Sequence, residues 1–380
     1  MIVDAHAYCF PPADAPAGHA SGAAHLRWVQ VSHAGHHQPA WRVRDRAPAT
    51  SAPLAAAGRI VLEEVPDVGF RVDHQRGRVV WAAGGEDCTK QFYPPALRDL
   101  EFTPHSLVAE MDYAGVDVCL LHTDPMLGRG SAYQAACVAT YPDRLRSMAP
   151  VDEWRIPAET DAVVAELEAA VRTHRLHAIK FNPPHAYFHG QGPWDEGPFR
   201  TFWDAAVELG VPVFFTLGTG PAETRQSLTP RQQQQGYLGE LRILMRWLAR
   251  YPRAVCSLTH GFPYRAFLDD PAQPRGLRFP PEIWEPFQHP HLHLEVSFPV
   301  RLGDLFDFPY VPVWPALEEM VARLGARRLL WGTDMPFQNR FCTYRQSRRW
   351  LEGPPYCPFL TEEDRHWILG GTAARLLGLS

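Results

Sequence analysis

The sequence has no C-x-x-C pair and no long apolar segment. Its seven cysteines are scattered over 380 residues, and an odd number at irregular spacing matches neither a disulfide scaffold nor a cysteine-rich zinc site. We therefore expect a reduced, cytoplasmic compartment. No apolar run approaches the roughly 18 residues that a membrane-spanning helix needs, so we expect no membrane partner.

The sequence also lacks an excess of positive charge. The formal net charge is −5, so no general basic field would attract nucleic acid, and we expect no such partner. Proline, in contrast, is abundant. The 37 prolines are about twice the average usage, which predicts long, stiff loops around a regular core.

Eight short apolar segments recur along the chain and predict eight β-strands. They span residues 2–6, 116–122, 146–151, 177–182, 211–217, 254–260, 291–297 and 328–333. Most of the stretches between them carry apolar residues at helical spacing, as in Leu107, Met111 and Ala114. Strands alternating with helices indicate a parallel sheet. Eight such units predict a (β/α)8 barrel of the TIM type.

Residues 11–103 interrupt this alternation. Segments 59–63, 69–73 and 77–81 could be strands, and the last two are spaced to form a hairpin. We interpret residues 1–10 as barrel strand 1, residues 11–103 as a β-containing lid insertion, and residues 104–380 as the rest of the barrel. A second stretch, 262–290, is rich in proline and aromatic residues and is expected to cover the same face.

Polar side chains follow most of the predicted strands. In a parallel barrel the carboxyl ends of the strands converge on one face, where the chemistry takes place. Strand 1 contributes Asp4, His6 and Tyr8, and strand 7 ends near Glu295. The other candidates that follow strands are His122, Lys180, His185, Thr216, His260 and Asp334. Taken alone, each histidine would more often be structural, but their convergence favours a site.

Several motifs occur in a fixed order along the chain. They are Val3-Asp-Ala-His-Ala-Tyr, Ala109-Glu-Met-Asp-Tyr-Ala-Gly-Val-Asp, Tyr141-Pro-Asp-Arg-Leu, Ile179-Lys-Phe-Asn-Pro, Leu209-Gly-Val-Pro-Val-Phe-Phe, Leu258-Thr-His-Gly, Trp331-Gly-Thr-Asp-Met-Pro and Gly371-Thr-Ala-Ala-Arg-Leu-Leu-Gly-Leu. Together they resemble the amidohydrolase-related (amidohydrolase type 2) family, in the branch of aminocarboxymuconate-semialdehyde and γ-resorcylate decarboxylases. The resemblance covers residues 1–10 and about 104–380.

The resemblance implies a barrel that holds a single metal ion. In such barrels two residues of the strand-1 motif, a histidine after strand 5 and the aspartate of strand 8 are typical ligands. His6, His260 and Asp334 match family positions, but Tyr8 and Thr216 stand where two histidines are expected. Phenol and hydroxyl groups are poor zinc ligands. His6 and Asp334 therefore remain as an incomplete ligand set for one divalent metal, Zn or Mn, and a site without metal stays open.

The chemistry expected of this site depends on a histidine and an aspartate. His260 and Asp334 could form a catalytic acid–base pair, in which the aspartate orients the imidazole. Tyr8 could donate to a developing oxyanion. The substrate-binding candidates are Tyr8, Lys180, His185, Thr216 and His122. Three arginines that follow strands 6, 7 and 8 could clamp an acidic group: Arg265, Arg301 and Arg340.

We therefore expect a carbon–carbon lyase, most simply a non-oxidative decarboxylase of an aromatic or unsaturated carboxylic acid. A hydrolase of a lactone, ester or amide is the first alternative. A metal-free pseudoenzyme or small-molecule binding protein is the second. The expected partner is a small acidic or aromatic substrate, and the resemblance also implies a homodimer.

Overall fold

The computed structural model describes residues 1–55, 62–189, 192–220 and 228–379. All eight predicted strands are present and parallel, and they follow chain order around the sheet. They are β1 (Val3–Ala7), β7 (Val118–Leu121), β8 (Leu145–Ala149), β9 (Ala178–Phe181), β10 (Val213–Phe215), β11 (Cys256–Leu258), β12 (Leu292–Val296) and β13 (Leu329–Trp331). A parallel bridge between Ala7 and Met335 joins the first strand to the segment after the last. The predicted (β/α)8 barrel is confirmed.

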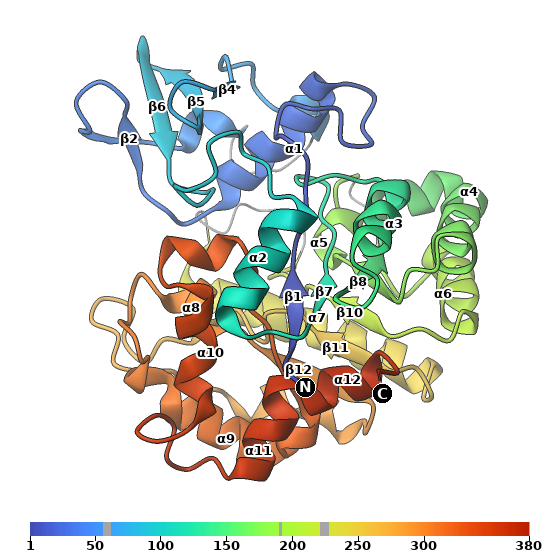
Figure 1. The fold of residues 1–380 in the computed structure, drawn as a ribbon. Helices are drawn as coiled ribbons and strands as arrows, with labels where there is room; N and C mark the ends of the chain where they lie inside the picture. Colours follow the sequence, from blue (N-terminus) through green and yellow to red (C-terminus); the bar gives the residue numbers. More distant parts are fainter. Residues whose placement is uncertain (56–61, 190–191, 221–227, 380) are drawn as a thin grey trace.

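Helices cover the outside of the barrel, as the helical spacing predicted (Figure 1). They are α2 (Pro104–Ala114), α3 (Ser131–Thr140), α4 (Ile156–Glu168), α5 (Pro183–Ala186), α6 (Pro198–Glu208), α7 (Pro230–Arg250), α8 (Phe298–Leu302), α9 (Trp314–Leu324), α10 (Tyr344–Glu352), α11 (Glu362–His366) and α12 (Thr372–Leu376). Helix α2 buries the predicted Leu107, Met111 and Ala114. Thr361 caps α11 by accepting the backbone N–H of Asp364 at 3.1 Å, and a hydroxyl at this position satisfies an otherwise unpaired donor.

Short 3-10 and π turns complete the connections. The 3-10 turns are η1 (Ala52–Leu54), η2 (Leu62–Glu64), η3 (Glu153–Arg155), η6 (Tyr264–Phe267), η7 (Pro281–Gln288), η8 (Val311–Val313), η9 (Ala326–Arg328) and η10 (Phe337–Arg340), and the π turns are η4 (Ala169–Thr173) and η11 (Trp367–Gly371). The loop after β11 forms its own aromatic core, in which Phe262 lies 5.1 Å from Phe279 and 5.5 Å from Trp284, centroid to centroid. These buried rings stabilise the Pro-rich loop itself.

The segment after β1 forms a separate antiparallel sheet with one helix, α1 (Gly22–Gly35). The strand order is β3-β2-β6-β5-β4. The strands are β2 (Ala40–Arg42), β3 (Pro48–Ala49), β4 (Arg71–Asp73), β5 (Arg78–Ala83) and β6 (Glu86–Lys90). The predicted hairpin is confirmed by the β4–β5 pair. In Figure 1 the arrow of β1 points toward α1 and this sheet, so the insertion lies over the carboxyl end of β1, away from both termini.

Two expectations for the insertion differ from the structure. The strand predicted at 59–63 is wrong at residues 62 and 63, because residues 62–64 form a 3-10 turn. Residues 59–61 lie outside the described residues. Helix α1 carries no clear apolar stripe, since its buried face includes His25, Gln30 and His33. Apolar periodicity therefore gave no signal for it.

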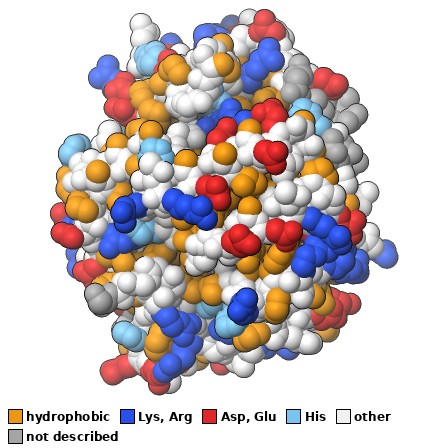
Figure 2. Space-filling model, turned by 90° about the vertical axis from the view of Figure 1, so that its right-hand side faces the viewer, with side chains coloured by type: hydrophobic (Ala, Val, Ile, Leu, Met, Phe, Trp, Pro, Cys, Tyr) orange, Lys and Arg blue, Asp and Glu red, His pale blue; other side chains and the backbone are white. Residues whose placement is uncertain are grey.

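The surface and the helices agree with the charge and hydropathy of the chain. Figure 2 shows acidic and basic side chains interspersed on the face it displays, without a field of one sign. Among the described residues, no helix is both long and apolar enough to cross a membrane. All seven cysteines are buried and free.

Candidate active site at the strand ends

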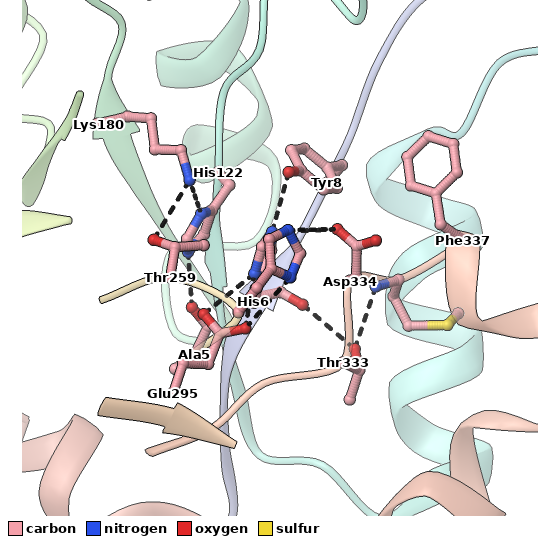
Figure 3. Close-up of polar contacts among 12 residues, drawn as sticks. Ala5, His6, Tyr8, His122, Lys180, Thr259, Glu295, Thr333, Asp334 and Phe337 are labelled. Atoms are coloured by element: carbon pink, nitrogen blue, oxygen red, sulfur yellow. Dashed lines mark hydrogen bonds and ion pairs between the residues drawn. The ribbon is translucent and has the colours of Figure 1, made fainter. Parts of the chain in front are cut away.

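His6 occupies the centre of a polar cluster at the carboxyl end of β1 (Figure 3). Its Nδ1 lies 3.0 and 3.1 Å from the two carboxylate oxygens of Glu295. Its Nε2 lies 2.9 Å from Tyr8 Oη and 3.2 Å from Asp334 Oδ1. A carboxylate only accepts hydrogen bonds, so Nδ1 carries a proton. Burial alone would lower the pKa of His6, but Glu295 and Asp334 outweigh it and raise the pKa to about 9.

His260 and Asp334 flank the same cluster. His260 Nε2 lies 3.8 Å from Asp334 Oδ1, and His260 Nδ1 lies 3.8 Å from Glu295 Oε1. Their side chains are 14% and 12% exposed, whereas those of His6 and Glu295 are 0% and 1% exposed. The two partly exposed groups therefore form the accessible face of the cluster.

The backbone of both residues is strained. His260 has φ 62° and Asp334 has φ 63°, a left-handed conformation that side chains other than glycine adopt rarely. The glycine two positions before Asp334 is also required, because a Cβ at Gly332 would lie 2.6 Å from Glu295 Cδ. Strain of this kind persists where the surrounding structure fixes it, and it is concentrated at functional sites.

Asp4 connects β1 to the segment after β13. Its Oδ2 accepts hydrogen bonds from Thr333 Oγ1 at 2.5 Å and Tyr344 Oη at 2.6 Å, and its Oδ1 accepts from the backbone N–H of His6 at 2.9 Å. Burial raises the pKa of Asp4 to about 6 even though these bonds oppose the rise. Asp4 therefore positions the two strands and is not turned toward a ligand.

His122, which follows β7, and Lys180, in β9, pack around His6. The His122 ring stacks on His6 at 3.7 Å with 10° between the planes. Its Nε2 lies 2.8 Å from Ala5 O, so Nε2 donates and Nδ1 accepts from Lys180 Nζ at 3.0 Å. Burial lowers the pKa of His122 well below its usual range and that of Lys180 to about 8. Since Lys180 also donates to Thr259 Oγ1 at 3.3 Å, the substrate-binding roles of these two residues stay predictions.

His185 and Thr216 lie apart from these contacts. His185 Nδ1 is 3.2 Å from Glu153 Oε2, and its ring packs against Trp28 of the insertion at 5.4 Å. The Thr216 backbone N–H donates to Phe181 O at 3.0 Å. Its hydroxyl is buried and has no hydrogen-bond partner among the described residues. The structure thus brings His6, Tyr8, His122, Lys180, His260 and Asp334 together, but not His185 and Thr216.

Glu295 is the member of the cluster to which sequence reasoning gave no role. It contacts both His6 and His260, although it lies within β12, where all five residues are buried. A fully buried acid inside a strand is costly unless it has a partner. That signal was present in Leu292-His-Leu-Glu-Val and could have identified it.

The donor atoms fit a divalent metal ion. One donor atom each from His6, His260 and Asp334 lies within 4.8 Å of the others. An ion about 2.1 Å from each donor in tetrahedral geometry places neighbouring donors roughly 3.4 Å apart, and the two distances to Asp334 Oδ1 are 3.2 and 3.8 Å. Glu295 holds Nδ1 of His6 and so presents Nε2, which is the usual arrangement for a ligating histidine. His260 thus extends the incomplete pair His6 and Asp334 to three donors.

A second group, formed by His6, His122 and Glu295, also has donor atoms within 4.8 Å of one another. It fits a metal less well. Glu295 is already bound to His6 Nδ1, and both nitrogens of His122 are hydrogen-bonded, to Ala5 and Lys180. An ion there would have to break these contacts.

Solved structures share this fold at low sequence identity. A 2,6-dihydroxybenzoate decarboxylase from Rhizobium is 20% identical with a TM-score of 0.53, covering 73% of this chain and 89% of its own. A probable 2-pyrone-4,6-dicarboxylic acid hydrolase from Acinetobacter baumannii, with citric acid bound, is 15% identical with a TM-score of 0.52, covering 81% and 96%. A dihydroxybenzoic acid decarboxylase from Polaromonas sp. JS666, with manganese and 2-nitroresorcinol bound, is 20% identical with a TM-score of 0.52, covering 75% and 89%.

No curated protein sequence matches the chain. A family model described as amidohydrolase matches residues 87–379. This match begins within the insertion, at β6, and continues through the barrel to the last helix, which is more than half of the chain. The chain belongs to the amidohydrolase family.

Proposed function

We propose that the protein is a non-oxidative decarboxylase of an aromatic or unsaturated carboxylic acid, with His260 and Asp334 as its acid–base pair. The observation that carries the proposal is their exposure. They are the accessible members of a cluster in which His6 and Glu295 are buried. A substrate that reaches this face meets an imidazole and a carboxylate that lie 3.8 Å apart.

The chemistry of decarboxylation matches this pair. The bond between the ring or alkene carbon and the carboxyl carbon breaks, CO₂ leaves, and the electron pair stays on the carbon. That carbon then takes a proton, so the balance is R–COO⁻ + H⁺ → R–H + CO₂. In this proposal His260 Nε2 delivers the proton, and Tyr8, whose pKa burial raises well above its usual range, is the neutral donor for a substrate oxygen.

His6, His260 and Asp334 are the residues that would hold a divalent ion. When bound, such an ion supplies a positive charge to a substrate carboxylate or phenol oxygen. His260 then has two possible roles, proton donor or third ligand. Metal analysis of the His260→Ala variant separates them: lost turnover with metal retained indicates proton transfer, and lost metal indicates ligation.

A hydrolase of a lactone, ester or amide is the second candidate, because the same pair could take a proton from water. A solved structure with this fold carries the name of a probable hydrolase. The test is a panel assay of the purified protein: CO₂ release from hydroxybenzoates supports the decarboxylase, and hydrolysis of lactones or aryl esters without CO₂ supports the hydrolase. Binding without turnover of either class would leave the small-molecule binding protein.

Three further predictions belong to this proposal. The division of the chain into 1–10, 11–103 and 104–380 treats the insertion as one lid over the site. The substrate is a small acidic or aromatic molecule. The assembly is a homodimer, which gel filtration with light scattering tests directly.

A further inference from the structure

Arg301 lies on α8, just after β12, and it is partly buried. Its guanidinium makes neither a hydrogen bond nor an ion pair with any residue that the structure describes. Burial lowers the pKa of Arg301, and the nearby charge of Asp334 opposes this fall. Arg301 therefore carries a positive charge that interacts with the charge of Asp334 in the candidate active site. Within the described chain, no carboxylate contacts its guanidinium.

A cavity of about 180 Å³ lies beside Arg301, at the boundary between insertion and barrel. The insertion lines it with Gly35, His36 and His37, and the barrel lines it with Pro263, Arg265 and Arg301. This volume is smaller than a typical pocket for a whole ligand, which is about 300 Å³ or more. It suits one substituent of a ligand whose remainder lies at the strand ends.

The other charged residues around the cavity have ion-pair or hydrogen-bond partners. Asp304 forms an ion pair with Arg265 and lies 3.5 Å from His37 Nε2. Arg340 donates to the carbonyl oxygens of Phe92 and Phe337 and lies 3.0 Å from His36 Nε2. Burial holds the pKa of His36 well below its usual range, so its imidazole is neutral. These contact partners of Arg340 are therefore uncharged. Among the described residues, Arg301 and Arg340 therefore bring to this boundary two positive charges that no carboxylate contacts, with Asp334 as the nearest negative charge named for each.

We infer that Arg301 binds a second carboxylate of the substrate in this cavity, so that the substrate class is small aromatic or unsaturated dicarboxylic acids. The inference rests on the proposed decarboxylase. The group held by Arg301 is the carboxylate that stays. A guanidinium on the departing carboxylate would stabilise the reactant and oppose formation of neutral CO₂, whereas on a remote group it orients the substrate without that cost. The planar fork of arginine suits a carboxylate.

Equilibrium binding tests the inference without turnover. Isophthalate and 3-carbamoylbenzoate have nearly the same shape, but the second replaces one carboxylate by a neutral amide. Calorimetry should show that the wild-type protein binds isophthalate about 10- to 100-fold more tightly, as expected for a charge-assisted contact. Arg301→Gln should lose most of this preference. Arg301→Lys, which keeps the charge without the fork, should retain part of it. Arg242→Gln, on the exposed face of α7, is the control and should behave as wild type.

Several outcomes would overturn the inference. These are equal binding of the two probes by wild type, no binding of isophthalate at 10 mM, or an unchanged preference in both Arg301 variants. The result is separable from the proposed function. If no acid releases CO₂ but the preference depends on Arg301, the decarboxylase fails and the anion subsite stands. If CO₂ is released and the preference ignores Arg301, the subsite fails alone.

Discussion

The two halves of the barrel mouth differ in how their polar groups are used. Around β1, β12 and β13, His6 and Glu295 are buried and closely paired, and Asp334 joins them at 3.2 Å. Around β9 and β10, Lys180 is turned toward His122, and the Thr216 hydroxyl has no partner among the described residues. The first half is preorganised for charge and proton transfer. In the second half the Thr216 hydroxyl is unsatisfied, as expected where a ligand supplies the missing partner. The buried Ser297 hydroxyl, directly after β12, also has no partner among the described residues.

This difference changes how the two missing histidines are interpreted. Tyr8 has taken a place in the paired half, where its hydroxyl lies 2.9 Å from His6 Nε2. The Thr216 hydroxyl makes no such hydrogen bond within the described residues. The substitution at Tyr8 therefore alters the central cluster itself, whereas the substitution at Thr216 alters what the opposite half can offer a substrate.

The largest expected effect comes from removing the partly exposed pair, His260 and Asp334. His260→Ala and Asp334→Ala should each lower kcat/KM by about 10²- to 10⁴-fold, the usual contribution of a positioned acid or base. Steady-state kinetics of CO₂ release measures this. Asp161→Ala, on the exposed face of α4, is the control. Activity within a few-fold of wild type in both site variants would discard the assigned pair.

Glu295→Gln should have the next largest effect. Gln keeps the size of the side chain but cannot hold the His6 Nδ1 proton as a carboxylate does, and such changes cost about 10- to 100-fold in metal affinity or activity. Equilibrium dialysis with Mn²⁺ and kinetics should show the loss together. Glu285→Gln, which is exposed in η7, should change neither. Wild-type metal binding and activity in Glu295→Gln would show that the paired half is not preorganised by this residue.

Asp304 provides a pH-dependent test of the boundary between insertion and barrel. Burial alone would raise its pKa, but the hydrogen bond with His37 and the charge of Arg265 lower it to about 2. A folded pKa below the unfolded value stabilises the protein above about pH 4, and this stabilisation is lost as the pH falls toward 2. Because Asp304 lies at the surface and solvent screens its contacts, urea unfolding should show Asp304→Asn less stable than wild type by about 1 kcal/mol at pH 6, with a smaller difference at pH 3. A difference that stays constant with pH would contradict the assignment.

Thr216→Val should have the smallest effect, because it removes a hydroxyl that has no partner among the described residues. Unfolding stability should stay within about 1 kcal/mol of wild type. KM should rise by about 3- to 10-fold with kcat unchanged, since one neutral hydrogen bond to substrate is lost. Thr216→Ser, which keeps the hydroxyl, should restore KM. An unchanged KM in Thr216→Val would remove Thr216 from the substrate-binding residues.

The barrel was predictable from sequence, whereas the site was predictable only in part. Strands buried on both faces are rich in apolar residues, so all eight were located to within a few residues. His6 lies near the carboxyl end of β1, and His260 and Asp334 follow β11 and β13 closely, which brought them together in the prediction. His185 follows β9 just as closely, but Glu153 holds it against the insertion. A partner so distant in sequence leaves no periodic signal, and neither does the histidine-rich face of α1.

One labelling experiment tests the central claim most directly. Hydroxybenzoates and benzenedicarboxylates such as isophthalate, with ¹³C in the carboxyl groups, are incubated with the protein in deuterated water, and the products are measured by mass spectrometry and NMR. The account predicts one ¹³CO₂ and one deuterium at the former carboxyl-bearing carbon per turnover in wild type, and loss of both in the Asp334→Asn variant. Absence of ¹³CO₂ across the panel, or unchanged release in Asp334→Asn, would contradict it.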